Sequence, residues 1–223
     1  MRIHTFEQRS KEWEKVRVGK FTASNFHCLL GNGYATISKI LWRIAFERLT
    51  GRLQQPKIWT ADIQRGINME PAARRAYEQI TGNKVRQVGF IERDDWSGAS
   101  PDGLPGVKKG LEIKCPSREN FLKYKKRTTV RPDHMTQMQF AMFCGDLETY
   151  DYVIYCAGEE PIIQRDIERD NDKILQIHQA LENLKIEVLR HMKTIRDIKN
   201  INPTELMMES AKAPGLCLVT HQK

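Results

Sequence analysis

Apolar residues recur every three or four positions along several stretches of the chain, which is the pattern of helices with one buried face. Residues 38–50 follow this pattern and end at Gly51, and glycine is common just past a helix C-terminus. Residues 172–198 follow it for longer, with one apolar stripe formed by Ile174, Ile177, Leu181, Leu184, Val188, Met192 and Ile195. We also predict helices over residues 22–30 and 132–143, the second with proline at its first position, and a short helix within residues 117–127.

Residues 60–81 form a further, longer helical pattern with recognisable ends. Thr60 is a candidate N-cap, and Gly82 is a candidate stop. Pro71 lies inside this stretch and has no backbone N–H to donate. We therefore expect either a kink at Pro71 or the start of a new helix there.

Short apolar runs bounded by turn residues predict strands over residues 84–92, 97–101, 110–115, 150–157 and 160–167. The last two runs flank Gly158 and predict a hairpin. Helices come first, then strands with one helix inserted, then a final helix, which indicates an α+β fold with a central mixed sheet flanked by helices. We expect one domain over residues 1–200 and a C-terminal tail of uncertain order over residues 201–223.

The chain is basic, with a formal net charge of +8 and a pI near 9.3. This balance favours polyanionic partners, nucleic acid first and acidic membranes second. No apolar run reaches membrane-spanning length, and the polar N-terminus argues against a signal peptide. The five cysteines are scattered, with no Cys-X-X-Cys pair, which favours reduced thiols in the cytoplasm over a zinc or iron–sulfur site.

Three charged residues around the predicted strand 110–115 carry the clearest chemical signal. Asp102 lies in a Pro-Asp-Gly turn, and a short basic loop leads from it to Leu-Glu112-Ile-Lys114-Cys. In a strand Glu112 and Lys114 share one face. Two carboxylates and a lysine suit a hard divalent cation and phosphoryl chemistry. The alternatives are an ordinary turn aspartate and a surface ion pair on a solvated strand face.

Five motifs resemble those of the lambda exonuclease (YqaJ-type viral recombinase) family of restriction-endonuclease-like nucleases. They occur in the family's order at residues 13–24, 66–77, 100–103, 111–116 and 135–139. Glu-X-Lys alone is a weak signal, whereas the ordered set is specific. Ala141 stands where some related nucleases carry a tyrosine.

The resemblance implies an enzyme with a restriction-endonuclease-like core. Its expected activity is Mg²⁺-dependent 5′-to-3′ exonuclease digestion of one strand of linear double-stranded DNA. Mononucleotides would be released, leaving a 3′ overhang for recombination by strand annealing. It also implies two metal ions, with Mn²⁺ as the alternative metal. The expected substrate has a 5′-phosphorylated DNA end, and the expected assembly is a ring-shaped homotrimer. The expected partner is a single-strand annealing protein, with no membrane. The expected location is a bacterial or phage-infected host cytoplasm.

The resemblance also implies roles for individual residues. Asp102, Glu112 and Glu70 are expected metal ligands, and the carbonyl of Ile113 is expected beside them. Lys114 is expected to contact the attacking water or the scissile phosphate, either as a base or as a charge stabiliser. These four charged residues form the predicted catalytic set. For Glu70 the alternative is an ordinary residue near a helix start.

Four further residues are expected to bind the substrate. Arg17 and Ser24 match the family's pocket for the 5′ phosphate, although Ser24 could equally be a helix cap. Gln137 is expected to contact a phosphate or the water, with a polar helix face as the alternative, and Ser100 is expected to contact a phosphate. The basic run 123–131 either follows the DNA backbone or is a solvated surface.

For three other residues, His134, Trp42 and Trp59, we expect structural roles. His134 is expected at an exposed helix start, and Trp42 and Trp59 are expected in core or interface packing. Two other functions use the same features: an endonuclease built on the same core, and a DNA-end-binding protein without catalysis.

Overall fold

A computed structural model of the chain describes residues 1–31, 33–54 and 60–200. Its helices are α1 (Lys11–Arg17), α2 (Ala23–Gly31), α3 (Tyr34–Thr50), α4 (Ala61–Thr81), α5 (Arg118–Lys125), α6 (Pro132–Gly145) and α7 (Asn171–Asn200). Its strands are β1 (Arg2–His4), β2 (Phe21–Thr22), β3 (Phe90–Glu92), β4 (Ser97–Ala99), β5 (Lys109–Lys114), β6 (Thr149–Ile154) and β7 (Ile162–Glu168). None of the helices in these residues is long and apolar enough to cross a membrane. The predicted tail 201–223 and Trp59 lie outside the described residues.

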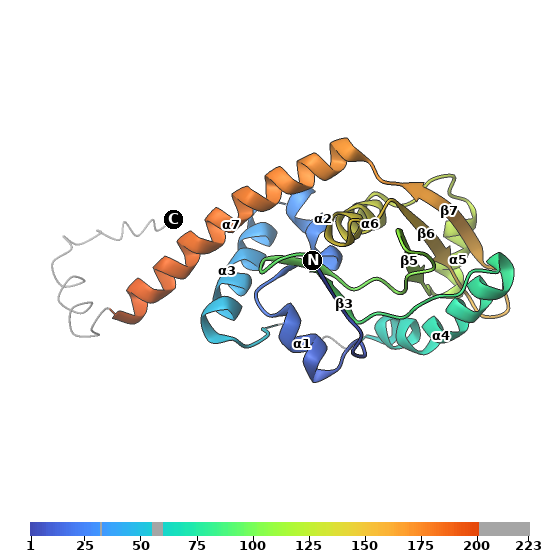
Figure 1. Cartoon of the computed structure of the whole chain (residues 1–223), viewed down its shortest axis with the longest axis horizontal. Helices are drawn as coiled ribbons and strands as arrows, with labels where there is room; N and C mark the ends of the chain where they lie inside the picture. Colours follow the sequence, from blue (N-terminus) through green and yellow to red (C-terminus); the bar gives the residue numbers. More distant parts are fainter. Residues whose placement is uncertain (32, 55–59, 201–223) are drawn as a thin grey trace, which may run out of the picture.

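The strands form two hydrogen-bonded mixed sheets (Figure 1). One sheet has the order β1-β3-β4-β2, and the other has the order β5-β6-β7. The predicted hairpin is present as β6 and β7, which pair antiparallel, while β5 pairs parallel to β6. The chain leaving β4 runs back along β5, where Gly103 and Leu111 form an isolated bridge. This α+β arrangement confirms the predicted fold class.

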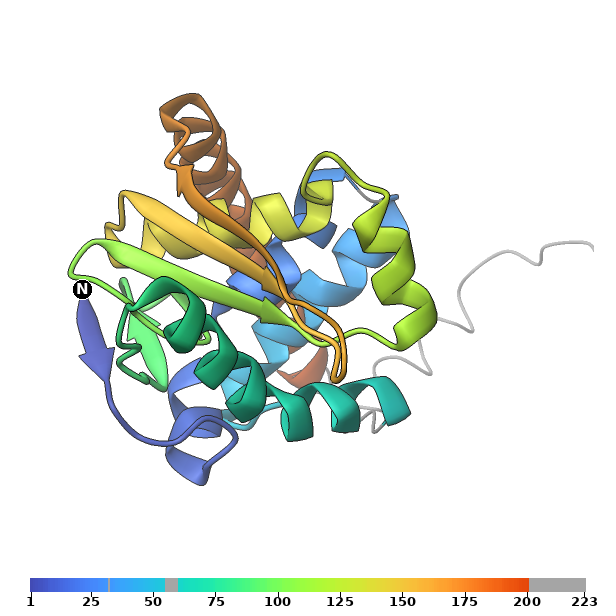
Figure 2. The same cartoon turned by 90° about the vertical axis from the view of Figure 1, so that its right-hand side faces the viewer.

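Helices α4 and α6 cover opposite faces of the β5-β6-β7 sheet (Figure 2). On one face, Ala73 and Tyr77 of α4 pack against Leu111 and Ile113 of β5. On the other face, the C-terminal half of α6 is buried throughout and belongs to the main core. Side chains that alternate along β5 therefore point toward two different helices.

The apolar stripe predicted for the last helix is confirmed. Ile177, Leu181 and Val188 are buried in the main core, and α7 runs along α3 (Figure 1). Helix α2 joins the same core through Phe26, whose ring lies 4.2 Å from that of Phe140 on α6.

The short strands differ most from the sequence prediction. The predicted strand 84–92 is regular only over β3, from Phe90 to Glu92, and the residues before it make one isolated bridge, between Arg86 and Leu104. Strands β1 and β2 were not predicted, since two or three residues are too few to show an alternation.

Helix α4 continues without interruption through Pro71. The expectation of a new helical start there is therefore wrong. Proline removes one hydrogen bond from a helix of 21 residues, and packing of the following turns on β5 maintains the rest.

A buried polar network fixes α4 on the sheet. Asp151 of β6 is fully buried and accepts hydrogen bonds from the Tyr77 hydroxyl at 2.5 Å and from the Asp166 backbone N–H at 2.8 Å. The ammonium of Lys109 lies 3.2 Å from the same carboxylate. Burial and the Asp151 bond raise the pKa of Tyr77, so the phenol keeps its proton and remains a donor. The network therefore ties α4 to β6 at Tyr77.

We expect Tyr77→Phe to lower the free energy of unfolding by about 1–3 kcal/mol, because it leaves one buried oxygen of Asp151 without its donor. In a domain of this size about 1 kcal/mol corresponds to about 2–4 °C in Tm. Urea denaturation measures the loss. The matched control is Tyr34→Phe at an exposed position on α3. Equal stabilities of the two variants would contradict the role of this network.

Candidate active site

Five segments distant in sequence meet around a small cavity of about 220 Å³, and one of them is the loop before α1, which contributes Arg9. The other four are α4, the turn after β4, the end of β5, and α6. The lining includes six of the residues predicted for the site: Glu70, Asp102, Glu112, Ile113, Lys114 and Gln137. The fold thus brings the predicted metal ligands, the lysine and the glutamine to one place.

Glu112 and Lys114 form an ion pair on one face of β5, in which Glu112 is buried and Lys114 is partly exposed. The Glu112 side chain is almost inaccessible, since the residue is only 3% exposed. Lys114 Nζ lies 2.6 Å from Glu112 Oε1. Gln137 of α6 joins them, because its amide donates to Glu112 at 2.7 Å and its carbonyl accepts from Lys114 at 3.1 Å. The pair is therefore not the solvated surface ion pair that the sequence left open.

Asp102 is directed into the site by β5. Its Oδ2 accepts the backbone N–H of Ile113 at 2.6 Å, and its own N–H donates to the Leu111 carbonyl at 3.0 Å. Burial raises the pKa of the Asp102 carboxyl well above its ordinary value, and the Glu112 and Glu70 carboxylates raise it further. The two glutamates thus oppose ionisation of Asp102.

Glu70 reaches the cavity from α4 and is held by Arg74, one turn further along. Arg74 Nη2 donates to Glu70 Oε1 and also to the backbone carbonyl of Asp102 at 3.1 Å. One guanidinium therefore links two of the predicted metal ligands. The sequence interpretation did not assign a role to Arg74, although acid–base spacing of i, i+4 on a predicted helix was the available signal.

The carboxylates fit a hard divalent cation by their chemistry. Within residues 1–31, 33–54 and 60–200, no group of three His, Cys, Asp or Glu side chains is already arranged to hold a metal. Instead Lys114, Arg74 and the Ile113 N–H supply the positive partners. The repulsion that raises the pKa of Asp102 is the unfavourable term that a cation among oxygen ligands would relieve. Glu70, Asp102 and Glu112 are the residues that would hold it.

The charge state of Lys114 follows from its neighbours. Burial lowers the pKa of Lys114, but Glu112 and Asp102 raise it by more, so the net direction is upward. The lysine is therefore an ammonium ion in this arrangement. This favours the charge-stabilising role over the base for Lys114.

Arg17 and Ser100 form a second polar group close to the first. Arg17 is only 7% exposed, and its guanidinium lies 3.9 Å from the centre of the Trp13 ring. Its Nη1 donates to Ser100 Oγ at 3.4 Å, and Trp13 Nε1 donates to the same oxygen at 2.8 Å. Burial and Arg43 lower the pKa of Arg17 to about 10, so it is still charged at neutral pH. Ser100 precedes Asp102 by two residues, so a short stretch of backbone links this pair to the carboxylate cavity.

Ser24 is exposed on the first turn of α2, and its hydroxyl lies 3.3 Å from that of Thr22. The parallel register of β2 and β4 pairs Thr22 with Gly98 and brings this turn toward Ser100. Among the described residues, no hydrogen bond joins Ser24 to Arg17 or Ser100. The structure therefore brings Arg17 and Ser100 into contact, and it places Ser24 only in their neighbourhood.

A basic groove of about 510 Å³ adjoins the carboxylate cavity on its α5 side. It shares Ile113, Lys114 and Cys115 with that cavity. Its other basic side chains are those of Arg65, Lys123, Arg127 and Arg131. Part of the basic run 123–131 thus lines a path into the site.

The prediction that His134 is exposed is wrong. Its ring is largely buried, and Nδ1 lies 2.5 Å from the Tyr152 hydroxyl. Burial and the nearby Lys114 lower the pKa of His134 to about 4, so the ring is neutral at pH 7. Trp42 is partly exposed at the α3–α7 surface, where it stacks on His191 at 4.2 Å.

Comparison with known proteins adds the family. Residues 12–148, well over half of the chain, match the YqaJ-like viral recombinase domain. The chain belongs to this family. The resemblance seen in the sequence is therefore confirmed. A comparison with curated proteins gives no match.

Solved structures agree with this YqaJ-like assignment. The alkaline exonuclease LHK-Exo from Laribacter hongkongensis is 30% identical with a TM-score of 0.77, over 85% of this chain and 98% of that chain. Its complex with dAMP gives a TM-score of 0.78 at the same identity and coverage. A phage-related exonuclease from Haemophilus somnus shares the fold, with a TM-score of 0.59 and 16% identity over 80% of this chain and 96% of that chain. The predicted restriction-endonuclease-like fold is thus confirmed.

We expect Asp102→Asn to raise the Tm of this YqaJ-like protein by a few degrees in EDTA at neutral pH. The raised pKa of Asp102 means that folding favours the protonated acid. The contribution of Asp102 to the free energy of unfolding is therefore most favourable below the pKa of an unfolded aspartate. This contribution is lost as the pH rises through the folded pKa. Thermal melts across pH measure this. The wild type should lose stability over that range relative to Asp102→Asn. Parallel curves for both proteins would contradict the repulsion among the three acids.

Proposed function

We propose that this protein is a divalent-metal-dependent exonuclease that degrades one strand of linear double-stranded DNA in the 5′-to-3′ direction. Mononucleotides would be released, and the remaining 3′ overhang would serve recombination by strand annealing. The observation that carries the proposal is the convergence of Glu70, Asp102, Glu112, Lys114 and Gln137 on one cavity beside a basic groove.

The comparisons support the same activity. LHK-Exo is an exonuclease, and this chain matches nearly its whole length. Its structure has been solved with dAMP, a deoxynucleoside monophosphate. A deoxynucleotide ligand suits an enzyme that cuts DNA. A binding protein without catalysis is a poorer fit, because it has no need for three mutually repelling acids in one cavity.

The chemistry divides among the residues of the cavity. A divalent cation held by Glu70, Asp102 and Glu112 would neutralise phosphate charge and lower the pKa of a water molecule. The Lys114 ammonium, fixed by Glu112 and Gln137, stabilises negative charge on the scissile phosphate. Arg74 keeps Glu70 beside Asp102, so that the ligand geometry does not depend on a free side chain.

Direction of digestion would come from Arg17 and Ser100. A terminal phosphate carries more charge than an internal phosphodiester, and a buried guanidinium recognises it strongly. Arg17 Nε is buried and has no hydrogen-bond partner in the described residues, so a donor remains for a ligand. Ser24 would complete this pocket.

The proposed assembly follows the family resemblance. It includes a ring-shaped homotrimer around DNA, a single-strand annealing protein as partner, Mg²⁺ or Mn²⁺ as the metal with two ions per site, and a cytoplasmic location. Sedimentation and native mass spectrometry test the trimer directly.

We expect Asp102→Ala to reduce hydrolysis of linear duplex DNA by at least about 10³-fold, because a metal ligand is removed, and to leave DNA binding largely intact. Release of labelled mononucleotides with Mg²⁺ measures the rate, and a gel shift in EDTA measures binding. The exposed Asp197→Ala on α7 is the matched control. Wild-type rates in Asp102→Ala would refute the metal assignment.

We expect Arg17→Ala to lower the preference for a 5′-phosphate over a 5′-hydroxyl end by about tenfold or more. The measurement is the ratio of kcat/KM on the two duplexes, which cancels any general loss of folded protein. Arg196→Ala, exposed on α7, should leave the ratio unchanged. An unaltered ratio in Arg17→Ala would show that the terminal phosphate binds elsewhere.

The same assay separates an exonuclease from an endonuclease on this core. Covalently closed circular DNA has no end, so the proposed enzyme should leave it intact while it digests linear DNA. Degradation of closed circles at a comparable rate would favour the endonuclease.

A further inference from the structure

Arg9 has an unusual backbone conformation for its residue type. Its φ is 71°, and it is one of three non-glycine residues with positive φ in the described part of the chain. The other two are Asp146 and Asp166, and aspartate tolerates this region better because its short side chain can bond locally. Arginine has no such compensation, whereas glycine would adopt this φ without strain.

Contacts on both sides hold Arg9 in this conformation. The side-chain amide of Gln8 donates to the carbonyls of Pro101 at 2.9 Å and Val88 at 3.3 Å. Ser10 on the other side is the N-cap of α1, and its hydroxyl accepts the N–H of Trp13. Strained residues that are fixed in this way concentrate at functional sites.

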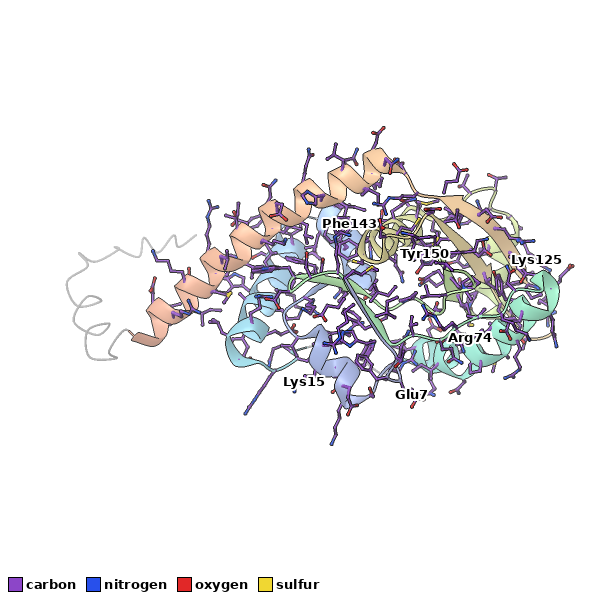
Figure 3. The ribbon with its side chains drawn as sticks, in the orientation of Figure 1. Glu7, Lys15, Arg74, Lys125, Phe143 and Tyr150 are labelled. Atoms are coloured by element: carbon purple, nitrogen blue, oxygen red, sulfur yellow. The ribbon has the colours of Figure 1, made fainter. Side chains whose placement is uncertain are left out.

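The Arg9 side chain reaches the carboxylate site. It lines the cavity of about 220 Å³. It also lines a second neighbouring cavity, distinct from the basic groove and also of about 510 Å³, which shares Glu70 and Asp102 with the first. Glu7 and Arg74 line the larger of these two, and Figure 3 labels both near the lower edge of the molecule. Arg9 thus lies at the boundary between the metal-ligand cavity and an open recess.

The present partner of Arg9 does not account for its position. Nη2 lies 3.7 Å from Glu70 Oε2, which is beyond hydrogen-bond distance, and the side chain is 48% exposed. No hydrogen bond from this side chain is found among the described residues. Arg74, which is only 11% exposed, already binds Glu70 closely. A half-exposed ion pair at that separation contributes little to stability, so the guanidinium has donors to offer a ligand.

We propose that Arg9 is a further substrate-binding residue whose guanidinium binds a phosphodiester of the strand being cleaved. It lies beside the acids that would hold the metal and, through Gln8, Pro101 and Ser100, close to the Arg17 pocket for the strand end. A phosphate there would meet a planar donor that can bind two oxygens. The backbone strain at Arg9 is then the consequence of using an arginine at a turn where glycine fits better. This inference rests on the proposed nuclease function.

The test compares Arg9→Gly, Arg9→Ala and Arg9→Lys. Arg9→Gly and Arg9→Ala both remove the guanidinium and should lower kcat/KM on linear duplex about tenfold or more. Arg9→Lys keeps the charge and should retain part of the rate. In thermal melts Arg9→Gly should exceed Arg9→Ala in Tm by about 2–4 °C, because only glycine relieves the backbone.

The salt dependence of DNA binding separates a phosphate contact from a structural effect. Binding is measured in the Asp102→Ala background, so that the DNA stays intact. Loss of one phosphate contact should make the slope of log K against log salt less steep by about 0.9. Asp146→Gly is the matched control for relief of a positive φ, and Arg196→Ala is the control for loss of a surface charge. Both controls should leave rate and slope unchanged.

The outcomes distinguish this inference from the proposed function. A wild-type protein that does not digest DNA with any divalent ion overturns both. A wild-type protein that digests DNA, with Arg9→Gly and Arg9→Ala matching its rate and its salt slope, overturns the Arg9 assignment alone. Reduced rates with a lower slope in both variants support it.

Discussion

Repulsion among three carboxylates in one small cavity is the constraint on which this structure depends. Glu70, Asp102 and Glu112 come from a helix, a turn and a strand, and burial with the two glutamates beside it raises the pKa of the Asp102 carboxyl. The fold holds them together by giving each its own donor: Arg74, the Ile113 N–H, and Lys114 with Gln137. A cation bound among these acids would relieve the repulsion between them, which is how such a site would favour binding a metal and a phosphate.

The scaffold keeps these acids from moving apart. Seven residues after Glu70, Tyr77 is bonded to the buried Asp151, so α4 cannot shift along the sheet without breaking a buried hydrogen bond. Asp102 is bonded to β5 through both its backbone and its side chain. The helix and the strand in this way hold the acids near one another, and fixed polar groups are what electrostatic catalysis requires.

Positive charge around the acids is arranged by degree of burial. Lys114 and Arg74 are bonded directly to the acids, and Arg17 is buried on Trp13 beside Ser100. The cations of the groove beyond, including Lys123 and Arg127, are exposed. Buried cations give fixed, strong recognition, whereas exposed cations attract a polyanion in a salt-dependent way. The basic residues near the acids thus fall into a buried or partly buried group and an exposed group.

The amino-acid sequence determined the long helices, the β6–β7 hairpin and the identity of the charged set. Helical periodicity and helix caps are local signals, and the spacing of Asp102, Glu112 and Lys114 is carried by one strand and the turn before it. Strands of two or three residues escaped, because they exist only through the partners they pair with. The tertiary structure alone decided that Arg74 links Glu70 to Asp102, that His134 is buried against Tyr152, and that Arg9 reaches the acids from the N-terminal loop. These contacts join residues far apart in the chain, and their energies depend on burial and distance, which no local pattern of residues contains.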